Sequence, residues 1–218
     1  MTSNQGKSII ILGAGGHAKV VADVLIKSDC KILGLVTPEK EKGSICFGCK
    51  VLGDDDVIDS YLDKGFLLAN GIGFLPGIPL RWELAKRMRD KGFSFVKVIH
   101  PSAIISDDVV IDDGVQIMAG SILQPGVHVG RDSIINTGTC VDHDCDIGQN
   151  CHLAPNVTLS GNVTIENGVH VGTGTSVIQN KKIGLNSVIA AASVIYHDIP
   201  DGVTYIQPRH EIIKSNRS

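Results

Sequence analysis

A six-residue repeat runs without interruption from residue 103 to residue 198 of this 218-residue chain. When the hexads are counted from Ala103, the third residue of each is aliphatic, and the residue four places later is nearly always small or β-branched; Lys181 is the one clear exception. A fixed short period of this kind is typical of a parallel β-helix. The aliphatic positions are Ile105, Ile111, Ile117, Leu123, Val129, Ile135, Val141, Ile147, Leu153, Leu159, Ile165, Val171, Val177, Ile183, Ile189 and Ile195.

Each hexad predicts one short strand and one corner, and three hexads close a triangular coil of 18 residues. The aliphatic side chain points into the prism, and the small residue lets the chain turn without overfilling the interior. Stacked coils pair through parallel β-ladders at a spacing of about 4.8 Å. The sixteen hexads therefore predict a little more than five coils, in which residues 18 positions apart lie above one another on one face.

The first hundred residues follow a different pattern, in which buried apolar runs alternate with amphipathic segments. We expect strands at residues 8–12, 31–36, 66–71 and 93–99. Helices are expected after the Gly13–Ala18 turn, with an apolar stripe over residues 20–25, and at residues 54–61 and 79–91. This order favours a small Rossmann-like parallel α/β unit. The hexads begin directly after His100-Pro101-Ser102, so we predict an α/β domain at residues 1–100 and a β-helix domain with a C-terminal tail at 101–218.

Charge and hydropathy narrow the possible partners. The net charge of −3 gives no electrostatic basis for binding nucleic acid or an anionic membrane. No apolar run approaches the roughly 20 residues of a membrane span, and the segment from Met1 to Lys7 shows no signal-peptide pattern. We therefore expect a cytoplasmic protein that contacts neither nucleic acid nor membrane.

The six cysteines do not predict disulfides or a metal site. Cys145 and Cys151 occupy small interior positions of the repeat, so we expect them in the core. Cys46 and Cys49 form a lone C-x-x-C, and a structural zinc site usually needs four ligands. We therefore interpret that segment as an ordinary loop and expect no bound metal.

A glycine-rich turn follows the first predicted strand. Its sequence, Gly13-Ala14-Gly15-Gly16-His17-Ala18, fits the G-x-G-x-x-G/A pattern that offers backbone N–H groups and a helix N-terminus to a phosphate. The dinucleotide fingerprint also requires an acid at the end of the second strand, whereas the nearest acid here is Glu39. We favour a nucleotide or sugar-nucleotide phosphate over NAD; the alternative is that the glycines only make a tight turn.

Three segments of the chain, taken together, match the pattern of a known family. The first is the glycine-rich turn, and the second is Ile99-His100-Pro101-Ser102-Ala103. The third runs from Ile134-Ile135-Asn136-Thr137 through Val141-Asp142-His143-Asp144-Cys145. Together they resemble the bacterial sugar O-/N-acetyltransferases of the NeuD/PglD type, over nearly the whole chain. The resemblance implies that an α/β domain binds a nucleotide sugar and that a left-handed β-helix binds acetyl-CoA. It also implies a homotrimer with active sites between neighbouring subunits.

The catalytic histidine of that family falls on His143. From the residues alone, His143 follows the inward Val141 by two places, at a corner where its ring can point outward, between Asp142 and Asp144. An imidazole with a pKa near 6.5 can accept a proton at neutral pH. A carboxylate on its other nitrogen would fix the tautomer, and the resemblance gives Asp144 this role.

The resemblance assigns the remaining contacts residue by residue. His152 matches a histidine that contacts the acetyl-CoA thioester region. Gly161, which follows His143 by 18 positions, matches a glycine whose N–H faces the acetyl carbonyl, as an oxyanion hole requires. The positions that it assigns to the sugar substrate are Gly13, Gly15, Gly16, His17 and Asn136.

The function implied is transfer of acetyl from acetyl-CoA to a nucleotide-linked amino deoxysugar in surface-glycan biosynthesis, with His143 as general base. Three alternatives stay open. The same site could O-acetylate a sialic-acid-like nonulosonate. A hexapeptide-repeat carbonic anhydrase would need three histidines on zinc, and only His152 and His170 stack in the repeat. A catalytically silent sugar-nucleotide-binding scaffold would keep the fold without using the His143–Asp144 pair.

Overall fold

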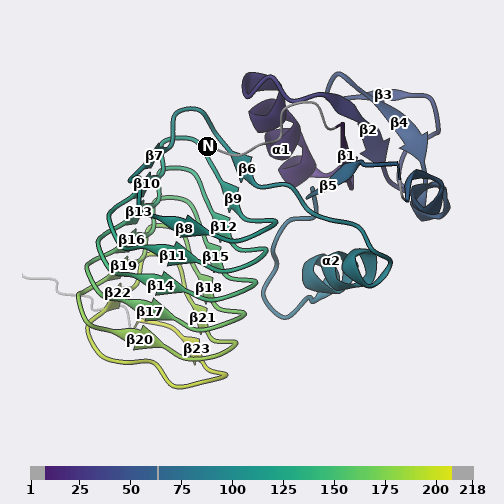
Figure 1. Ribbon diagram of the computed structural model, residues 1–218. Helices are drawn as coiled ribbons and strands as arrows, with labels where there is room; N and C mark the ends of the chain where they lie inside the picture. The colour runs from purple at the N-terminus through teal and green to yellow at the C-terminus, as the bar shows by residue number, and fades with distance from the viewer. Residues whose placement is uncertain (1–7, 63, 208–218) are drawn as a thin grey trace, which may run out of the picture.

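The computed structural model describes residues 8–62 and 64–207, which form an α/β domain and a triangular prism side by side (Figure 1). The sheet of the α/β domain has the strand order β3-β4-β2-β1-β5. All neighbouring pairs are parallel except β3 with β4. The strands are β1 (Ile9–Leu12), β2 (Ile32–Val36), β3 (Ile45–Cys46), β4 (Cys49–Gly53) and β5 (Leu67–Asn70).

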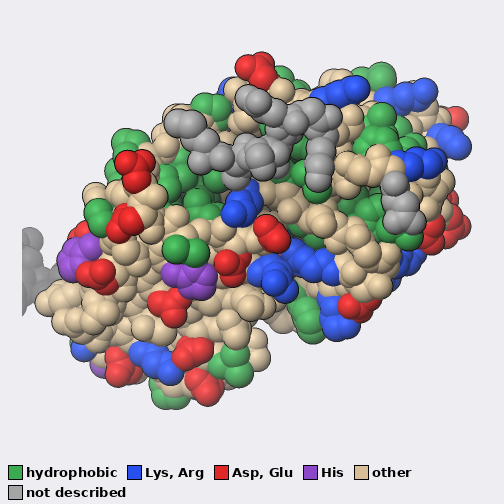
Figure 2. Space-filling model, viewed as in Figure 1, with side chains coloured by type: hydrophobic (Ala, Val, Ile, Leu, Met, Phe, Trp, Pro, Cys, Tyr) green, Lys and Arg blue, Asp and Glu red, His purple; other side chains and the backbone are tan. Residues whose placement is uncertain are grey.

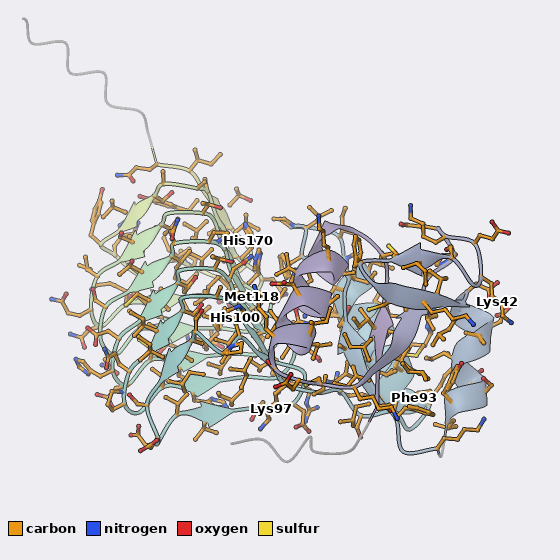
Figure 3. All side chains as sticks on the ribbon, turned by 90° about the horizontal axis from the view of Figure 1, so that it is seen from above. Lys42, Phe93, Lys97, His100, Met118 and His170 are labelled. Carbon is orange, nitrogen blue, oxygen red and sulfur yellow. The ribbon has the colours of Figure 1, made fainter. Side chains whose placement is uncertain are left out.

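Helices cover both faces of this sheet. Helix α1 (Gly16–Lys27) packs on the face of Ile9 and Ile11, while the 3-10 helix η1 (Asp55–Tyr61) and helix α2 (Leu80–Asp90) pack on the other face. The cluster under α1 also contains Met118 and Ile134 of the prism. Figure 3 shows α1 between the sheet and the prism, so one apolar core joins the two parts of the chain.

The alternation of strands and helices predicted this domain in outline, and two details were wrong. The fourth predicted strand, 93–99, pairs with the sheet only through an isolated bridge from Leu68 to Phe95. Its last residues form β6 (Val98–Ile99), the first rung of the prism. The hairpin β3–β4 was not predicted; Cys46 pairs with Cys49 across it, and Phe47 and Gly48 turn the chain with positive φ.

The prism has three walls of parallel strands. The first wall holds β6, β9 (Gln116–Ile117), β12 (Ile134–Ile135), β15 (His152–Leu153), β18 (His170–Val171), β21 (Val188–Ile189) and β23 (Thr204–Tyr205). The second wall holds β7 (Ile104–Ile105), β10 (Ile122–Leu123), β13 (Cys140–Val141), β16 (Thr158–Leu159), β19 (Ser176–Val177) and β22 (Val194–Ile195). The third wall holds β8 (Val110–Ile111), β11 (His128–Val129), β14 (Asp146–Ile147), β17 (Thr164–Ile165) and β20 (Lys182–Ile183).

The six-residue repeat accounts for the interior of this left-handed β-helix. From Ile117 to Ile195, every aliphatic residue of the series is at most 1% exposed. The small positions also face inward, and their polar atoms are satisfied by carbonyls of the next coil: Ser133 Oγ donates to the Gly148 carbonyl at 2.7 Å, and Cys145 Sγ to that of Ser160 at 3.2 Å. Cys145 and Cys151 are buried, as expected. Among the described helices, none has the length and apolarity needed to cross a membrane.

A buried charge cluster joins α2 to the corner between the third and first walls. Arg89 donates two hydrogen bonds to the carboxylate of Asp132, at 2.5 and 2.8 Å. Arg81 is 5% exposed and donates to the carbonyls of Asn70 and Ile72 at 3.2 and 2.6 Å. Arg81 also donates to the Asp132 carbonyl at 3.4 Å, so it holds the loop after β5 against the prism.

Candidate active site

His143 lies at the corner between the second and third walls, where both neighbouring aspartates fix it. Asp142 Oδ1 accepts a hydrogen bond from the His143 backbone N–H at 2.8 Å and holds the turn. Asp144, with a φ of 59°, places its carboxylate Oδ2 2.8 Å from His143 Nδ1. The imidazole is well exposed, with 59% of its side-chain surface open. Figure 2 shows acidic and histidine side chains gathered over the coils of the prism.

The hydrogen bond to Asp144 is the main reason that the pKa of His143 is raised. Desolvation opposes this rise, and the charges of Asp142 and Asp144 add to it. With Nδ1–H donating to the carboxylate, the Nε2 atom keeps its lone pair on the outer side of the ring. This is the arrangement of a general base held in one tautomer.

Gly161 lies directly beside that Nε2 atom. A Cβ built on Gly161 would stand 2.5 Å from His143 Nε2 and 2.6 Å from Cε1. Within the described residues, the Gly161 N–H donates to no backbone or side-chain acceptor, while its carbonyl accepts from Asn180 N at 3.1 Å. The absence of a side chain thus lets the imidazole pack directly against the Gly161 backbone, which brings an unused backbone donor close to the base.

Asn136 and His152 form a second cluster, on the first wall and its edge with the second. The Asn136 side-chain amide lies 3.1 Å from His152 Nε2, and His152 Nδ1 lies 3.1 Å from His170 Nδ1. Phe74 stacks on His170 with ring planes 9° apart. Burial is the main reason that the pKa of His152 falls to about 3, followed by the charges of His170, His17 and Arg81. His152 is therefore neutral at physiological pH.

His17 links the glycine turn to the prism. It lies in the first turn of α1, and its Nε2 is 2.7 Å from Gln116 Oε1. The Gln116 side-chain nitrogen donates to the Asn70 carbonyl at 2.7 Å, which makes Oε1 the acceptor for a His17 Nε2–H. Burial, and after it the charge of Arg81, lower the pKa of His17 to about 4. The bond to Gln116 raises the pKa and offsets part of this fall.

The fold requires glycine at only one of the three glycine positions of the turn. Gly13 has a φ of +94°, a conformation that side chains disfavour, and a Cβ there would lie 2.8 Å from Ile72 Cδ1. By contrast, a Cβ on Gly15 or Gly16 would meet nothing within 4 Å. Packing therefore does not require the last two glycines, and both are exposed at the start of α1, where a helix N-terminus can bind an anion.

Within one chain, the predicted site residues of the prism fall into two separate groups. His143, Asp144 and Gly161 share one corner of the prism, whereas Asn136 and His152 lie near the α/β domain. No hydrogen bond or ion pair among residues 8–62 and 64–207 joins the two groups. Nor do these residues contain a cluster of three side chains suited to hold a metal ion.

Sequence reasoning missed several residues that shape the second group. The repeat does place Gln116, His152 and His170 in one column, because they are spaced by multiples of 18. That register was a usable signal for a role of Gln116 and His170. Phe74 and Arg81 gave no such signal, because the long-range packing of a loop and a helix against the prism brings them to the site.

Comparison with known proteins identifies the family. Residues 8–88 match the model of the PglD N-terminal domain. The crystal structure of PerB from Caulobacter crescentus, in complex with CoA and GDP-perosamine, is 36% identical, with a TM-score of 0.83 over 91% of this chain and 93% of that chain. The chain belongs to the PglD-type family of sugar acetyltransferases. The predicted family and the predicted fold, an α/β domain followed by a left-handed β-helix, are thereby confirmed.

Two other members of the PglD-type family support the assignment. The acetyltransferase domain of PglB from Neisseria gonorrhoeae, in complex with acetyl coenzyme A, is 30% identical, with a TM-score of 0.83 over 91% of this chain and 95% of that chain. The UDP-N-acetylbacillosamine N-acetyltransferase of Bacillus subtilis is 36% identical over 117 residues. That match spans 52% of this chain and about half, 52%, of the curated enzyme.

Proposed function

We propose that this protein transfers the acetyl group of acetyl-CoA to the amino group of a nucleotide-linked amino deoxysugar. The observation that carries the proposal is the corner at His143, where Asp144 holds Nδ1 and the exposed ring places Nε2 beside Gly161. A base with a fixed tautomer beside an unused backbone donor fits acyl transfer. Relatives solved with CoA, acetyl-CoA and GDP-perosamine support both substrates.

The reaction needs no covalent enzyme intermediate. The sugar amine attacks the carbonyl carbon of the thioester while His143 Nε2 accepts the proton that the amine loses. The Gly161 N–H donates to the oxyanion that forms on the carbonyl oxygen. When the C–S bond breaks, the imidazolium returns its proton to the sulfur of coenzyme A, and the amide product leaves.

The separation of the two groups of residues supports an assembly of several chains. We propose a homotrimer in which the corner of His143 from one subunit meets the Asn136–His152 cluster of its neighbour. The α/β domain, residues 1–100, would hold the nucleotide sugar at Gly13, Gly15, Gly16 and His17, and the β-helix domain, residues 101–218, would hold acetyl-CoA. The end of the predicted C-terminal tail lies outside the described residues.

We further propose that the enzyme acts in the cytoplasm, in the synthesis of a surface glycan.

The test of the proposed activity is release of the coenzyme A thiol from acetyl-CoA with a panel of acceptors. The panel contains nucleotide-linked 3-amino and 4-amino deoxysugars together with free and CMP-linked sialic-type acids. We expect turnover on an amino sugar and its loss in His143→Ala, in which the trimer and coenzyme binding persist.

Other outcomes of this assay decide against the proposal. Turnover only on the sialic-type acids would assign O-acetylation to the same site. Normal turnover by His143→Ala would remove the assigned base, and failure of the wild type to bind acetyl-CoA would favour a sugar-nucleotide-binding scaffold.

A further inference from the structure

We propose that His170 is a positioning residue, which fixes the tautomer of His152 and thereby the orientation of the Asn136 side-chain amide. The inference rests on the proposed function, because it gives Asn136 and His152 a place at the substrates. It concerns a residue that neither touches His143 nor belongs to the glycine turn. Figure 3 shows His170 on the side of the prism that faces the α/β domain.

The orientation of the Asn136 amide follows from its neighbour. The Thr137 backbone N–H donates to Asn136 Oδ1 at 2.8 Å, so the oxygen must lie on that side. The Asn136 Nδ2 group then points to His152 Nε2 at 3.1 Å. An amide nitrogen donates and cannot accept, so His152 Nε2 must carry a lone pair.

The proton of His152 therefore lies on its other nitrogen. Because this buried imidazole is neutral, it has a single ring proton, and Nδ1 must carry it. Nδ1 is 3.1 Å from His170 Nδ1, which has to act as the acceptor. His170 in turn keeps its own proton on Nε2. Asn136 then donates to His152, and His152 donates to His170, so neither hydrogen bond sets two donors against each other.

The prism and the α/β domain both hold His170 in place. His152 and His170 are register partners in the parallel strands β15 and β18, so the ladder sets their separation. Phe74 lies over the His170 ring with centroids 5.4 Å apart. His170 also lines a cavity of about 300 Å³ between the 74–82 segment and the coils.

Loss of the acceptor at position 170 would free His152 to adopt the other tautomer. An Nε2–H on His152 would then face the Asn136 Nδ2 donor, and two donors cannot bond each other. The amide would have to rotate and give up its bond from Thr137. The second Asn136 N–H, which is available for a substrate, would lose its fixed direction.

The decisive variants are His170→Leu and His170→Asn, which have nearly the same size and shape. The Asn oxygen can occupy the position of Nδ1 and accept a hydrogen bond, whereas Leu cannot. The readout is the tautomer of His152 by long-range ¹H–¹⁵N correlation spectra of the full-length protein with labelled histidine. His152→Gln assigns the signal, and the circular dichroism spectrum and trimer size control for folding.

We expect His152 to be Nδ1-protonated in the wild type and in His170→Asn, and to gain the Nε2-protonated form in His170→Leu. The kcat of acetyl transfer should fall by up to about 100-fold in His170→Leu, because a small misplacement of a site group by a change away from the chemistry can cost that much. His170→Asn should recover most of that loss. An Nε2-protonated His152 in the wild type, an unchanged tautomer in His170→Leu, or equal losses in both variants would each overturn the proposal. The spectra need no substrate, so they decide the inference even if the wild type transfers no acetyl.

Discussion

Gly161 and His143 lie one coil apart, and the space of the missing Gly161 side chain is next to the imidazole edge that carries Nε2. No other pair in the described site combines a base with an unused backbone donor so closely. The relationship depends on the 18-residue coil, which places position 161 above position 143, and on glycine at that one place. Changes at either residue should therefore affect catalysis before they affect folding.

Gly161→Ala should lower kcat by about 100-fold or more, because the methyl group would push the His143 ring away from Asp144 and cover the N–H donor. The melting temperature should change little, since Gly161 does not have a positive φ. Steady-state kinetics with calorimetry check both statements. Thr164→Ala, on a neighbouring strand of the third wall, is the control and should keep full activity. A Gly161→Ala enzyme of normal kcat would show that this space is not used.

Asp144→Asn should move the acidic limb of the kcat/KM profile to lower pH. The bond to Asp144 raises the pKa of His143, so its loss lowers that pKa, and the base form then persists to more acidic pH. The plateau should nevertheless fall about 10- to 100-fold, because an amide can stabilise either tautomer but not the imidazolium. A limb that stays in place or moves to higher pH would contradict the role of Asp144.

Mixed trimers of His143→Ala and Asn136→Ala chains should regain activity that neither variant has alone. If a site takes His143 from one chain and Asn136 from its neighbour, random mixing at equal amounts gives about a quarter of competent sites. Co-expression with two different affinity tags supplies the mixed species for the thiol assay. Mixed trimers that remain inactive would place both groups in the site of a single chain, against the distribution described above.

The protein should lose stability as the pH falls from 8 to 5. The pKa of His152 is about 3 in the folded chain, below its usual 6.5, so the unfolded state binds the proton first. That single group should cost about 2 kcal/mol at pH 5 relative to pH 8. His17, with a pKa of about 4, acts in the same direction. Urea unfolding across this range measures the slope, which should be shallower in His152→Phe. A slope of the opposite sign, or one that His152→Phe leaves unchanged, would contradict this prediction.

Arg89→Leu should destabilise the junction of the two domains by about 3 kcal/mol, because it leaves the buried Asp132 carboxylate without its main partner. Asp132 is only 4% exposed on its side chain. Arg87→Leu is a matched control on the same helix, because the Arg87–Asp55 pair is exposed and such pairs contribute little. Thermal unfolding of both variants provides the comparison. Equal effects would mean that the Arg89–Asp132 pair adds nothing beyond a surface contact.

The prism could be predicted almost completely from the sequence, because a six-residue period dictates both the strand positions and the inward side chains. The α/β domain was predictable in its main elements, where apolar runs alternate with amphipathic ones. The end of its fourth strand was not: Val98 and Ile99 fit a buried sheet strand equally well, and only the neighbouring β9 draws them into the prism.

The positions of the candidate site residues could be predicted from the sequence better than their contacts. Position in the repeat places His143 at a corner and Gly161 one coil away, and the structure has both there. The contacts of His152 could not be derived in the same way. Its low pKa depends on burial, to which Phe74 of the α/β domain contributes by packing on the ring, and on the charges of His170, His17 and Arg81. Long-range docking of this kind leaves no periodic trace in the sequence.

The 18-residue coil also limits how such a chain can change length in evolution. An insertion of one whole coil beyond Gly161 would lengthen the prism and leave the corner of His143 unaltered. An insertion of six residues would instead carry every later corner to the next wall, and one of any smaller length would turn aliphatic side chains outward. Relatives that keep this site should therefore differ in the length of the prism by whole coils of 18 residues, and shorter insertions should occur only at the corners.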